Sequence, residues 1–154
     1  MSVMASGEFS AASKSASQAG PLRVLIADDS EVLRERTVAL VNGEGAEIVA
    51  EAVDGIDAFE KAKSLSPDLV VLDIRMPRKS GLEVLPQIAR LRPAPVVAVL
   101  TNYAYSAYRS RCAALGAGHF LDKSTEFEKL REIVAELVAL KARSGSVAGP
   151  GEDG

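Results

Sequence analysis

The 154-residue sequence contains one cysteine, one histidine and no tryptophan. The lone cysteine, Cys112, excludes a disulfide framework and a thiolate metal cluster within the chain. Hydrophobic runs reach only about seven residues, whereas a membrane span needs roughly 20, so we expect no membrane insertion. The chain does not open with a basic segment followed by an apolar one, which argues against secretion. With 18 Lys and Arg against 21 Asp and Glu, the net charge of −3 argues against binding to nucleic acid.

Two segments of low complexity flank a central block. Residues 1–20 hold six Ser and five Ala without sustained periodicity, which predicts a disordered Ser/Ala-rich leader. Residues 143–154 are rich in Gly and predict a flexible tail. The block between them, 21–142, has the length of one ordinary domain. We therefore expect a soluble, single-domain protein of the cytoplasm.

The central block alternates buried-strand and helix patterns. Five short runs rich in Val, Ile, Leu and Ala predict strands at Leu22–Ala27, Glu47–Ala52, Leu69–Leu72, Val96–Leu100 and His119–Leu121. A helical pattern follows each run, with Ser30 and Asp54 as predicted caps and a predicted capping box from Thr125 to Glu128. Such alternation predicts an α/β fold, with a doubly wound, five-stranded parallel sheet and helices on both faces.

Polar side chains stand at the carboxyl ends of the predicted strands. They are Asp28, Asp29, Asp73, Thr101 and Lys123. Ligands bind at this edge in open α/β sheets. Three converging carboxylates would repel one another and raise at least one pKa unless a cation joined them. Oxygen donors without Cys or a nearby His favour Mg²⁺ with a phosphate substrate, and a hydroxyl and an ammonium could hold the other phosphoryl oxygens.

Each of these residues also has a structural explanation when taken alone. Asp28 or Asp29 could cap the first helix, and Asp73 could be an ordinary turn residue. Thr101 could be a turn hydroxyl or a cap, and Lys123 a solvated surface lysine. Together, however, five polar residues at one end of an apolar sheet require a common cause.

The same residues lie within a series of short motifs. These are VLIADDS at 24–30, DG at 54–55, PDLVVLDIRMP at 67–77, Gly81, VAVLT at 97–101, LGA at 115–117 and FLDK at 120–123. With this order and spacing, the chain resembles the receiver domain of bacterial two-component response regulators, in particular the stand-alone type similar to the chemotaxis response regulator. The resemblance assigns residues 21–142 to that domain and implies a flavodoxin-like strand order, 2-1-3-4-5.

The resemblance also implies a metal site and a phosphoacceptor. Asp73 corresponds to the aspartate that accepts the phosphoryl group. The implied ligands of Mg²⁺, for which Mn²⁺ can substitute, are Asp28, Asp29, Asp73 and the backbone carbonyl of Arg75. Transfer to a carboxylate depends on positioning and charge neutralisation, because the incoming group is itself anionic.

Three further residues are implied to bind or report the phosphoryl group. Thr101 is the switch hydroxyl, Lys123 contacts the phosphoryl oxygens, and Phe120 is the aromatic residue whose rotamer changes. A sensor histidine kinase or a histidine phosphotransfer protein would be the donor, and an unknown downstream protein the target. We expect no enzymatic activity beyond the domain's own phosphorylation and dephosphorylation.

Alternative functions stay open at this point. The short segment after Lys141 predicts a receiver without an output domain, acting as a diffusible effector, a phosphorelay intermediate or a phosphate sink. A more remote alternative is a phosphohydrolase with an aspartyl nucleophile. Such enzymes usually carry a second Asp two residues after the nucleophile, where this chain has Arg75.

The loop before Gly81 departs from the usual pattern of the family. Arg78, Lys79 and Ser80 replace the more common apolar and acidic pair and place a basic rim beside the predicted acceptor. This rim is either a solvated loop or an attractor of an acidic partner or phosphodonor.

Overall fold

The computed structural model describes residues 20–43 and 45–147. The predicted leader lies outside the described residues apart from Gly20, as do residues 148–154 of the predicted tail. The strands are β1 (Leu22–Ala27), β2 (Ala46–Ala52), β3 (Leu69–Leu72), β4 (Val96–Thr101) and β5 (His119–Asp122). The helices are α2 (Glu31–Val41), α3 (Gly55–Leu65), α4 (Gly81–Ala89), α5 (Ser106–Ala114) and α6 (Lys129–Ser144).

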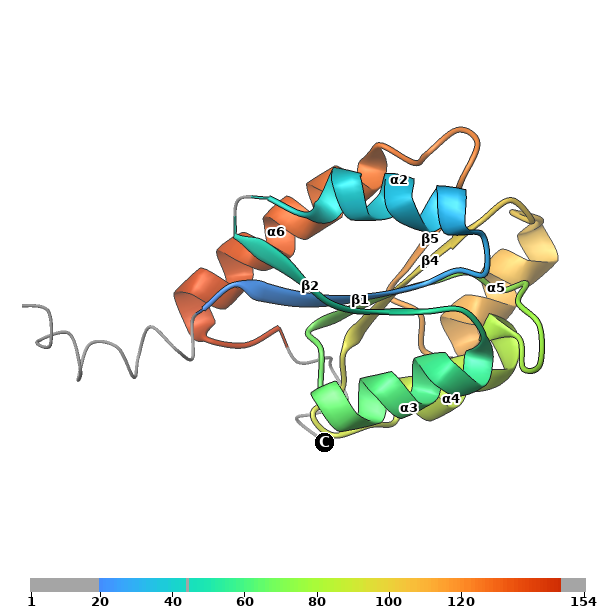
Figure 1. The fold of residues 1–154 in the computed structure, drawn as a ribbon, viewed down its shortest axis with the longest axis horizontal. Helices are drawn as coiled ribbons and strands as arrows, with labels where there is room; N and C mark the ends of the chain where they lie inside the picture. The colour runs from blue at the N-terminus through green and yellow to red at the C-terminus, as the bar shows by residue number, and fades with distance from the viewer. Residues whose placement is uncertain (1–19, 44, 148–154) are drawn as a thin grey trace, which may run out of the picture.

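The strands form one parallel sheet in the order β2-β1-β3-β4-β5. Helices α2 and α6 cover one face of the sheet, and α3, α4 and α5 cover the other (Figure 1). The predicted α/β fold, with its doubly wound sheet and strand order, is therefore confirmed. None of the helices in the described part of the chain is long and apolar enough to cross a membrane.

Alternation along the strands divides the core into two layers. In β1, Val24 and Ile26 face α2 and α6, whereas Leu25 and Ala27 face the other three helices. Successive side chains of a strand point to opposite faces of the sheet. Because helices cover both faces here, every residue of the strand must be apolar, which explains the unbroken apolar runs. The same alternation continues through β3 and β4.

Strand register aligns the carboxyl ends of the central strands. Ala27 at the end of β1 pairs with Leu72 at the end of β3, and Leu72 pairs with Val99 of β4. The residues that follow β1 and β3 are Asp28 and Asp73, so the register alone brings these two carboxylates to one edge of the sheet.

Two of the predicted helix caps are confirmed. The Ser30 hydroxyl accepts a hydrogen bond from the Leu33 amide, and the Asp54 carboxylate accepts one from the Asp57 amide. These bonds satisfy amides that have no partner within their own helix.

The capping box predicted from Thr125 to Glu128 is wrong. Residues 123–128 form turns, α6 begins only at Lys129, and Glu128 makes no side-chain bond as its cap. The Glu126 amide is bonded to the carbonyl of Asp122, which closes a turn before the helix starts. A capping box is present instead at Ser80 and Glu83, at the start of α4.

Packing continues beyond residue 142. Helix α6 runs to Ser144, and the Val147 side chain is buried in the core. Near the end of α6, the Lys141 ammonium donates to the Asp68 carboxylate at 2.7 Å and to the Pro21 carbonyl at 3.1 Å. These bonds fix α6 to the amino-terminal edge of the sheet, opposite the edge that carries Asp73.

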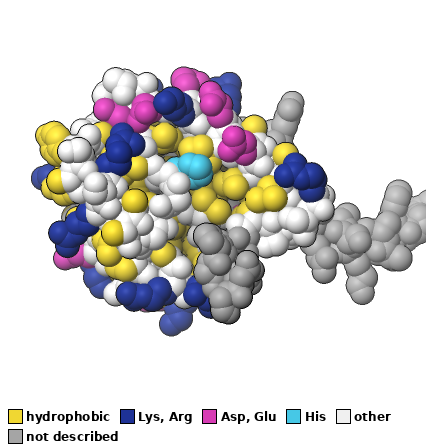
Figure 2. All heavy atoms as spheres, turned by 180° about the vertical axis from the view of Figure 1, so that it is seen from behind, with side chains coloured by type: hydrophobic (Ala, Val, Ile, Leu, Met, Phe, Trp, Pro, Cys, Tyr) yellow, Lys and Arg dark blue, Asp and Glu magenta, His cyan; other side chains and the backbone are white. Residues whose placement is uncertain are grey.

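The face opposite to that of Figure 1 shows where charge lies on the surface. In Figure 2, hydrophobic side chains gather around the single histidine, and Lys, Arg, Asp and Glu side chains lie mostly towards the rim. That histidine, His119, is half-buried at the amino end of β5, where it pairs in register with Ala98.

Gly81 is a position where the fold requires the absence of a side chain. A Cβ atom there would overlap the carbonyl oxygen of Asp73, which is backbone and cannot turn aside. The Gly81 amide donates to the carbonyl of Ile74 at 3.1 Å. The first turn of α4 therefore packs directly against the backbone that carries Asp73.

We predict that Gly81→Ala lowers the free energy of unfolding by about 1–3 kcal/mol, because the added methyl group forces backbone to move. Gly43→Ala is the matched control, since a Cβ at Gly43 meets nothing within 4 Å. This control should change stability by less than about 0.5 kcal/mol. Urea unfolding followed by circular dichroism measures both, and equal stabilities of the two variants would contradict the packing argument.

Candidate functional site

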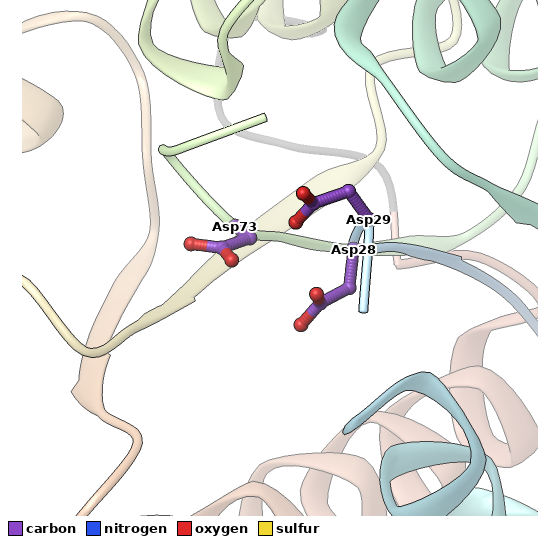
Figure 3. A group of neighbouring side chains, drawn as sticks. All are labelled: Asp28, Asp29 and Asp73. Carbon is purple, nitrogen blue, oxygen red and sulfur yellow. The ribbon is translucent and has the colours of Figure 1, made fainter. Parts of the chain in front are cut away.

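Three aspartates converge at the carboxyl edge of the sheet. Asp28 and Asp29 follow β1 and Asp73 follows β3, and their carboxylate groups gather near one another at the ends of these strands (Figure 3). One carboxylate oxygen from each lies within 4.8 Å of the others. Asp28 and Asp73 are buried and Asp29 is exposed, so the cluster opens to solvent on one side.

A buried lysine joins two of these carboxylates. The Lys123 ammonium donates to Asp28 Oδ2 at 2.7 Å and to Asp73 Oδ2 at 3.2 Å. The Lys123 side chain is 4% exposed, and those of Asp28 and Asp73 are 5% and 10% exposed. Because Lys123 follows β5 directly, and its amide donates to the Thr101 carbonyl at 2.8 Å, the strand end directs this long side chain across the site.

Asp28 is held from several directions. Its Oδ1 accepts from the Ser30 amide at 2.9 Å, and its backbone carbonyl accepts from the Arg34 guanidinium at 2.9 Å. Arg34 is itself held by Glu51 at 3.0 Å. The carboxylate of Asp28 is therefore oriented before any ligand binds.

The charge of Asp73 is poorly compensated. Burial raises the pKa of its carboxyl group above the ordinary value of 3.8, and the neighbouring charge of Asp28 adds to the increase. The Lys123 ammonium and the Arg75 amide, 3.3 Å from Asp73 Oδ1, oppose the increase without cancelling it. A further cation beside Asp73 would therefore stabilise its ionised form.

Thr101 and Phe120 lie on the β4 and β5 side of this cluster. Thr101 is fully buried, and its hydroxyl oxygen accepts from the Tyr103 amide at 3.1 Å. Phe120 is half-buried against the core under α3, α4 and α5. The Arg109 guanidinium lies 4.7 Å from the centre of the Phe120 ring and donates to its carbonyl at 3.0 Å. Phe120 is thus held between the core and an arginine.

Three tyrosines line the entry to α5. The ring centres of Tyr103 and Tyr105 are 6.5 Å apart, and those of Tyr105 and Tyr108 are 5.9 Å apart. Tyr105 is 62% exposed, whereas Tyr103 and Tyr108 are half-buried against the core. The Arg75 guanidinium lies 4.3 Å from the centre of the Tyr103 ring, so the loop after Asp73 contacts the loop after Thr101.

The loop between β3 and α4 is also tied to the start of α3. Arg78 Nε lies 2.9 Å from Asp54 Oδ2, and the Gly55 amide donates to the Lys79 carbonyl at 2.7 Å. The hydrogen bond from the Asp57 amide and the charge of Arg78 hold the pKa of Asp54 below its usual range, against the effect of burial. The sequence identified Asp54 as a cap and as part of the DG motif at 54–55, but it did not indicate the contact with Arg78.

Two residues that could carry chemistry lie away from the site. His119 is at the amino end of β5, whereas Lys123 follows the carboxyl end. Cys112 is fully buried in α5, and burial raises the pKa of its thiol. The structure thus brings Asp28, Asp29, Asp73 and Lys123 together, with Thr101 on the neighbouring strand end.

The donor set fits a hard divalent cation. Three carboxylate groups within 4.8 Å, one of them exposed, offer the oxygen ligands that Mg²⁺ takes while it retains several waters. Burial and the charge of Asp28 raise the pKa of Asp73, and a bound cation would oppose this increase. Neither sulfur nor imidazole lies in the cluster among the described residues.

Comparison with known proteins gives a consistent relationship. Residues 24–135 match the family model of the response regulator receiver domain. The transcriptional regulatory protein PdtaR of Mycobacterium tuberculosis is 42% identical over 137 residues, which cover 86% of this chain and 66% of PdtaR. This chain thus spans about two thirds of the length of PdtaR, and 29% to 38% of several protein-glutamate methylesterases that it also matches.

Solved structures show the same fold. The receiver domain of AraT, a response regulator from Geobacillus stearothermophilus, has a TM-score of 0.70 at 31% identity, covering 79% of this chain and 96% of that domain. A chain of the CheX–CheY–BeF₃–Mg²⁺ complex from Borrelia burgdorferi has a TM-score of 0.66 at 27% identity, covering 74% and 90%.

The burial of Asp73 predicts an unusual pH dependence of stability. The pKa of Asp73 is higher in the folded protein than its value of 3.8 in the unfolded chain, so the protonated carboxyl group favours folding. This contribution to stability is complete at a pH below 3.8, and it is lost as the pH rises through the pKa of the folded state. In metal-free buffer, Asp73→Asn should therefore have a higher free energy of unfolding than the native protein at pH 7. The difference should vanish as the pH falls towards 3.8, and urea unfolding from pH 3.5 to 8 measures it.

Asp122→Asn provides a control of opposite sign. Hydrogen bonds from Ser124 lower the pKa of Asp122, so its contribution is present above the unfolded value and is lost as the pH falls. This variant should be less stable than the native protein at pH 7. A loss of stability in Asp73→Asn at pH 7 would contradict the assignment.

Proposed function

This chain belongs to the response regulator receiver domain family, and we propose that it accepts a phosphoryl group on Asp73 in a Mg²⁺-dependent reaction. The proposal includes a phosphohistidine donor, on a sensor histidine kinase or a histidine phosphotransfer protein. In this proposal the phosphorylated form acts in the cytoplasm by changing its binding to another protein.

The observation that carries the proposal is the position of Lys123. Its ammonium lies 2.7 Å from a carboxylate oxygen of Asp28 and 3.2 Å from one of Asp73. The third carboxylate, that of Asp29, is exposed, so the pocket is open to solvent there. An ordinary structural ion pair needs one carboxylate for one ammonium. The surplus of acidic groups supports a site built for a second cation and for an anionic group beside it.

Asp28, Asp29 and Asp73 are the side chains that would hold Mg²⁺, together with the backbone carbonyl of Arg75. When bound, Mg²⁺ would supply the positive charge that offsets the carboxylates and stabilises the transferred phosphoryl group. The hydrogen bonds from Ser30 and Lys123 keep Asp28 oriented. Exposed Asp29 lies where an entering ion would first meet the site.

Asp73 is the proposed nucleophile. One carboxylate oxygen forms the new P–O bond while the P–N bond of phosphohistidine breaks, and the electron pair of that bond stays on the departing imidazole. The Lys123 ammonium would bind the phosphoryl oxygens and stabilise their charge, because it already lies 3.2 Å from the Asp73 carboxylate. Water can later attack phosphorus, which breaks the P–O bond to Asp73, releases inorganic phosphate and regenerates the carboxylate, so the modification is transient.

Thr101 and Phe120 supply the proposed switch. The Thr101 hydroxyl accepts a hydrogen bond from the Tyr103 amide and keeps its own O–H, with which it would turn to donate a hydrogen bond to a phosphoryl oxygen. Phe120, now held beside Arg109, would move inward as space opens near Thr101. These changes alter the surface of α5 and β5, where Tyr105 is exposed for contact with a partner.

The acceptor assignment predicts labelling by a small-molecule donor. Incubated with acetyl phosphate and Mg²⁺, the native protein should gain a hydroxylamine-labile phosphoryl group, measured by intact-protein mass spectrometry. Asp73→Asn should gain none, because an amide cannot form the acyl phosphate. Asp122→Asn, which changes another aspartate at the same edge, should be labelled like the native protein. Equal labelling of Asp73→Asn and the native protein would disprove the assignment.

Lys123→Met should separate metal binding from phosphoryl transfer. Removing the ammonium leaves Asp28 and Asp73 without their cation, so the affinity for Mg²⁺, measured by calorimetric titration, should rise. Labelling at saturating Mg²⁺ should slow on the order of 10²-fold, the usual cost of one lost donor to a developing charge. Lys129→Met, at an exposed lysine on α6, should change neither quantity. Unchanged labelling of Lys123→Met would contradict the role of Lys123.

A further inference from the structure

The segment between β3 and α4, residues 73–80, is anchored near its start by Ile74, which is buried in the core under α3, α4 and α5. Met76 is half-buried against the same core, whereas Arg75, Pro77 and Arg78 are exposed, so residues 77–80 bury little apolar surface and are held mainly by polar contacts. A loop with few buried apolar contacts opens locally at low free energy. The polar contacts of residues 77–80 therefore act together with the burial of Ile74 to keep the Asp73 carboxylate and the Arg75 carbonyl in position.

Arg78 makes one of these contacts in an unfavourable backbone conformation. Its φ is +67°, in the left-handed region, although it carries a full side chain. Such a conformation costs free energy and persists only where the surroundings impose it. Its side chain reaches Asp54 Oδ2 at 2.9 Å, while Asp54 Oδ1 accepts from the Asp57 amide at 2.8 Å.

The neighbouring residue makes a second contact with the same turn. The Gly55 amide donates to the Lys79 carbonyl at 2.7 Å, and a Cβ on Gly55 would overlap that carbonyl oxygen. Two consecutive loop residues are thus bound to two consecutive residues at the start of α3. Because Asp54 is 8% exposed and already fixed as the cap of α3, it is a rigid anchor for Arg78.

We propose that Arg78 is a positioning residue for the metal site: through its ion pair with Asp54 it holds the loop that carries Asp73 and the Arg75 carbonyl in the arrangement that binds Mg²⁺. This inference rests on the proposed function. Arg78 acts through the loop backbone and does not touch the phosphoryl group. Its loss therefore weakens metal binding more than it slows transfer at saturating metal.

A purely electrostatic effect of Arg78 and Asp54 predicts different changes in the affinity for Mg²⁺ from those predicted by their ion pair. Removing a positive charge near a cation site strengthens cation binding, and removing a negative charge weakens it. If Arg78 and Asp54 acted only through their fields, neutralising them would shift the affinity for Mg²⁺ in opposite directions. If they act as a pair, both changes weaken binding, and the second change adds little to the first.

The test uses Arg78→Asn, Asp54→Asn and the double variant of the full chain. Asn tolerates the left-handed backbone at position 78 and remains a good cap at position 54, so each change removes the ion pair and little else. Lys79→Gln controls for the loss of one positive charge in the same loop. Calorimetry gives the dissociation constant of Mg²⁺, acetyl phosphate labelling gives the rate, and hydrogen exchange of the Gly55 amide in metal-free protein reports loop opening.

Each single variant should bind Mg²⁺ about two- to fivefold more weakly, the range that one partly exposed ion pair can supply. The double variant should not exceed the larger single effect, and exchange of the Gly55 amide should accelerate in all three. Labelling at saturating Mg²⁺ should stay within about twofold of the native rate. Arg78→Lys should recover most of the affinity, and Lys79→Gln should show no loss.

Unchanged or tighter Mg²⁺ binding by Arg78→Asn would overturn the inference, as would additive effects in the double variant. Arg78→Gly, which adopts a positive φ without strain, repeats the test should the Asn variant fail to fold. If the proposed function is wrong, the native protein itself will remain unlabelled at Asp73, which is a different result from a failure of the positioning role. Labelled native protein with an unaffected Arg78→Asn refutes the positioning role alone.

Discussion

The structure of the site depends on one electrostatic constraint: three carboxylates are brought to one edge of an apolar sheet, where a single ammonium cannot balance them. Lys123 bridges Asp28 and Asp73, and both carboxylates are largely removed from solvent. Removing charges from water is costly unless they are paired and hydrogen-bonded. Burial, with the charge of Asp28 adding to it, raises the pKa of Asp73 although Lys123 opposes the increase. A chain selected for stability alone has no reason to keep this surplus of negative charge.

The fold imposes this constraint through strand register rather than through local sequence. Ala27 and Leu72 pair at the ends of β1 and β3, so the residues after them meet although they are far apart in the chain. Lys123 reaches the same point from the end of β5, across β4. On one side of the pocket, Arg75 contacts Tyr103, and on the other Arg78 contacts Asp54. The loop after Asp73 therefore connects the chemistry of the pocket to both α5 and α3.

Residues whose position follows from the sheet could be predicted from the sequence. Asp28, Asp73 and Lys123 each follow an apolar strand, and the edge they share follows from the parallel arrangement. Contacts that depend on loop conformation could not be predicted in this way. The pairing of Arg78 with Asp54 requires a positive φ at Arg78, and no local pattern demands one of an arginine. The capping box predicted from Thr125 to Glu128 was wrong for a related reason. The turn from Asp122 to Glu126 delays the start of α6, and its conformation cannot be predicted from the motif.

For the proposed function, charge balance favours binding of the cation before the phosphoryl group. With Asp28, Asp29, Asp73 and Lys123 ionised, the cluster carries a surplus of two negative charges, which one divalent cation neutralises. A phosphoryl group that approached before the cation would meet this surplus directly, and in a poorly solvated pocket that repulsion is only weakly screened. Lys123 alone cannot offset it while it is bound to both Asp28 and Asp73. In the proposed function, Asp28, Asp29 and Asp73 would hold the cation, whose charge would replace that of Lys123 beside the carboxylates, so that the same ammonium could bind the incoming phosphoryl oxygens.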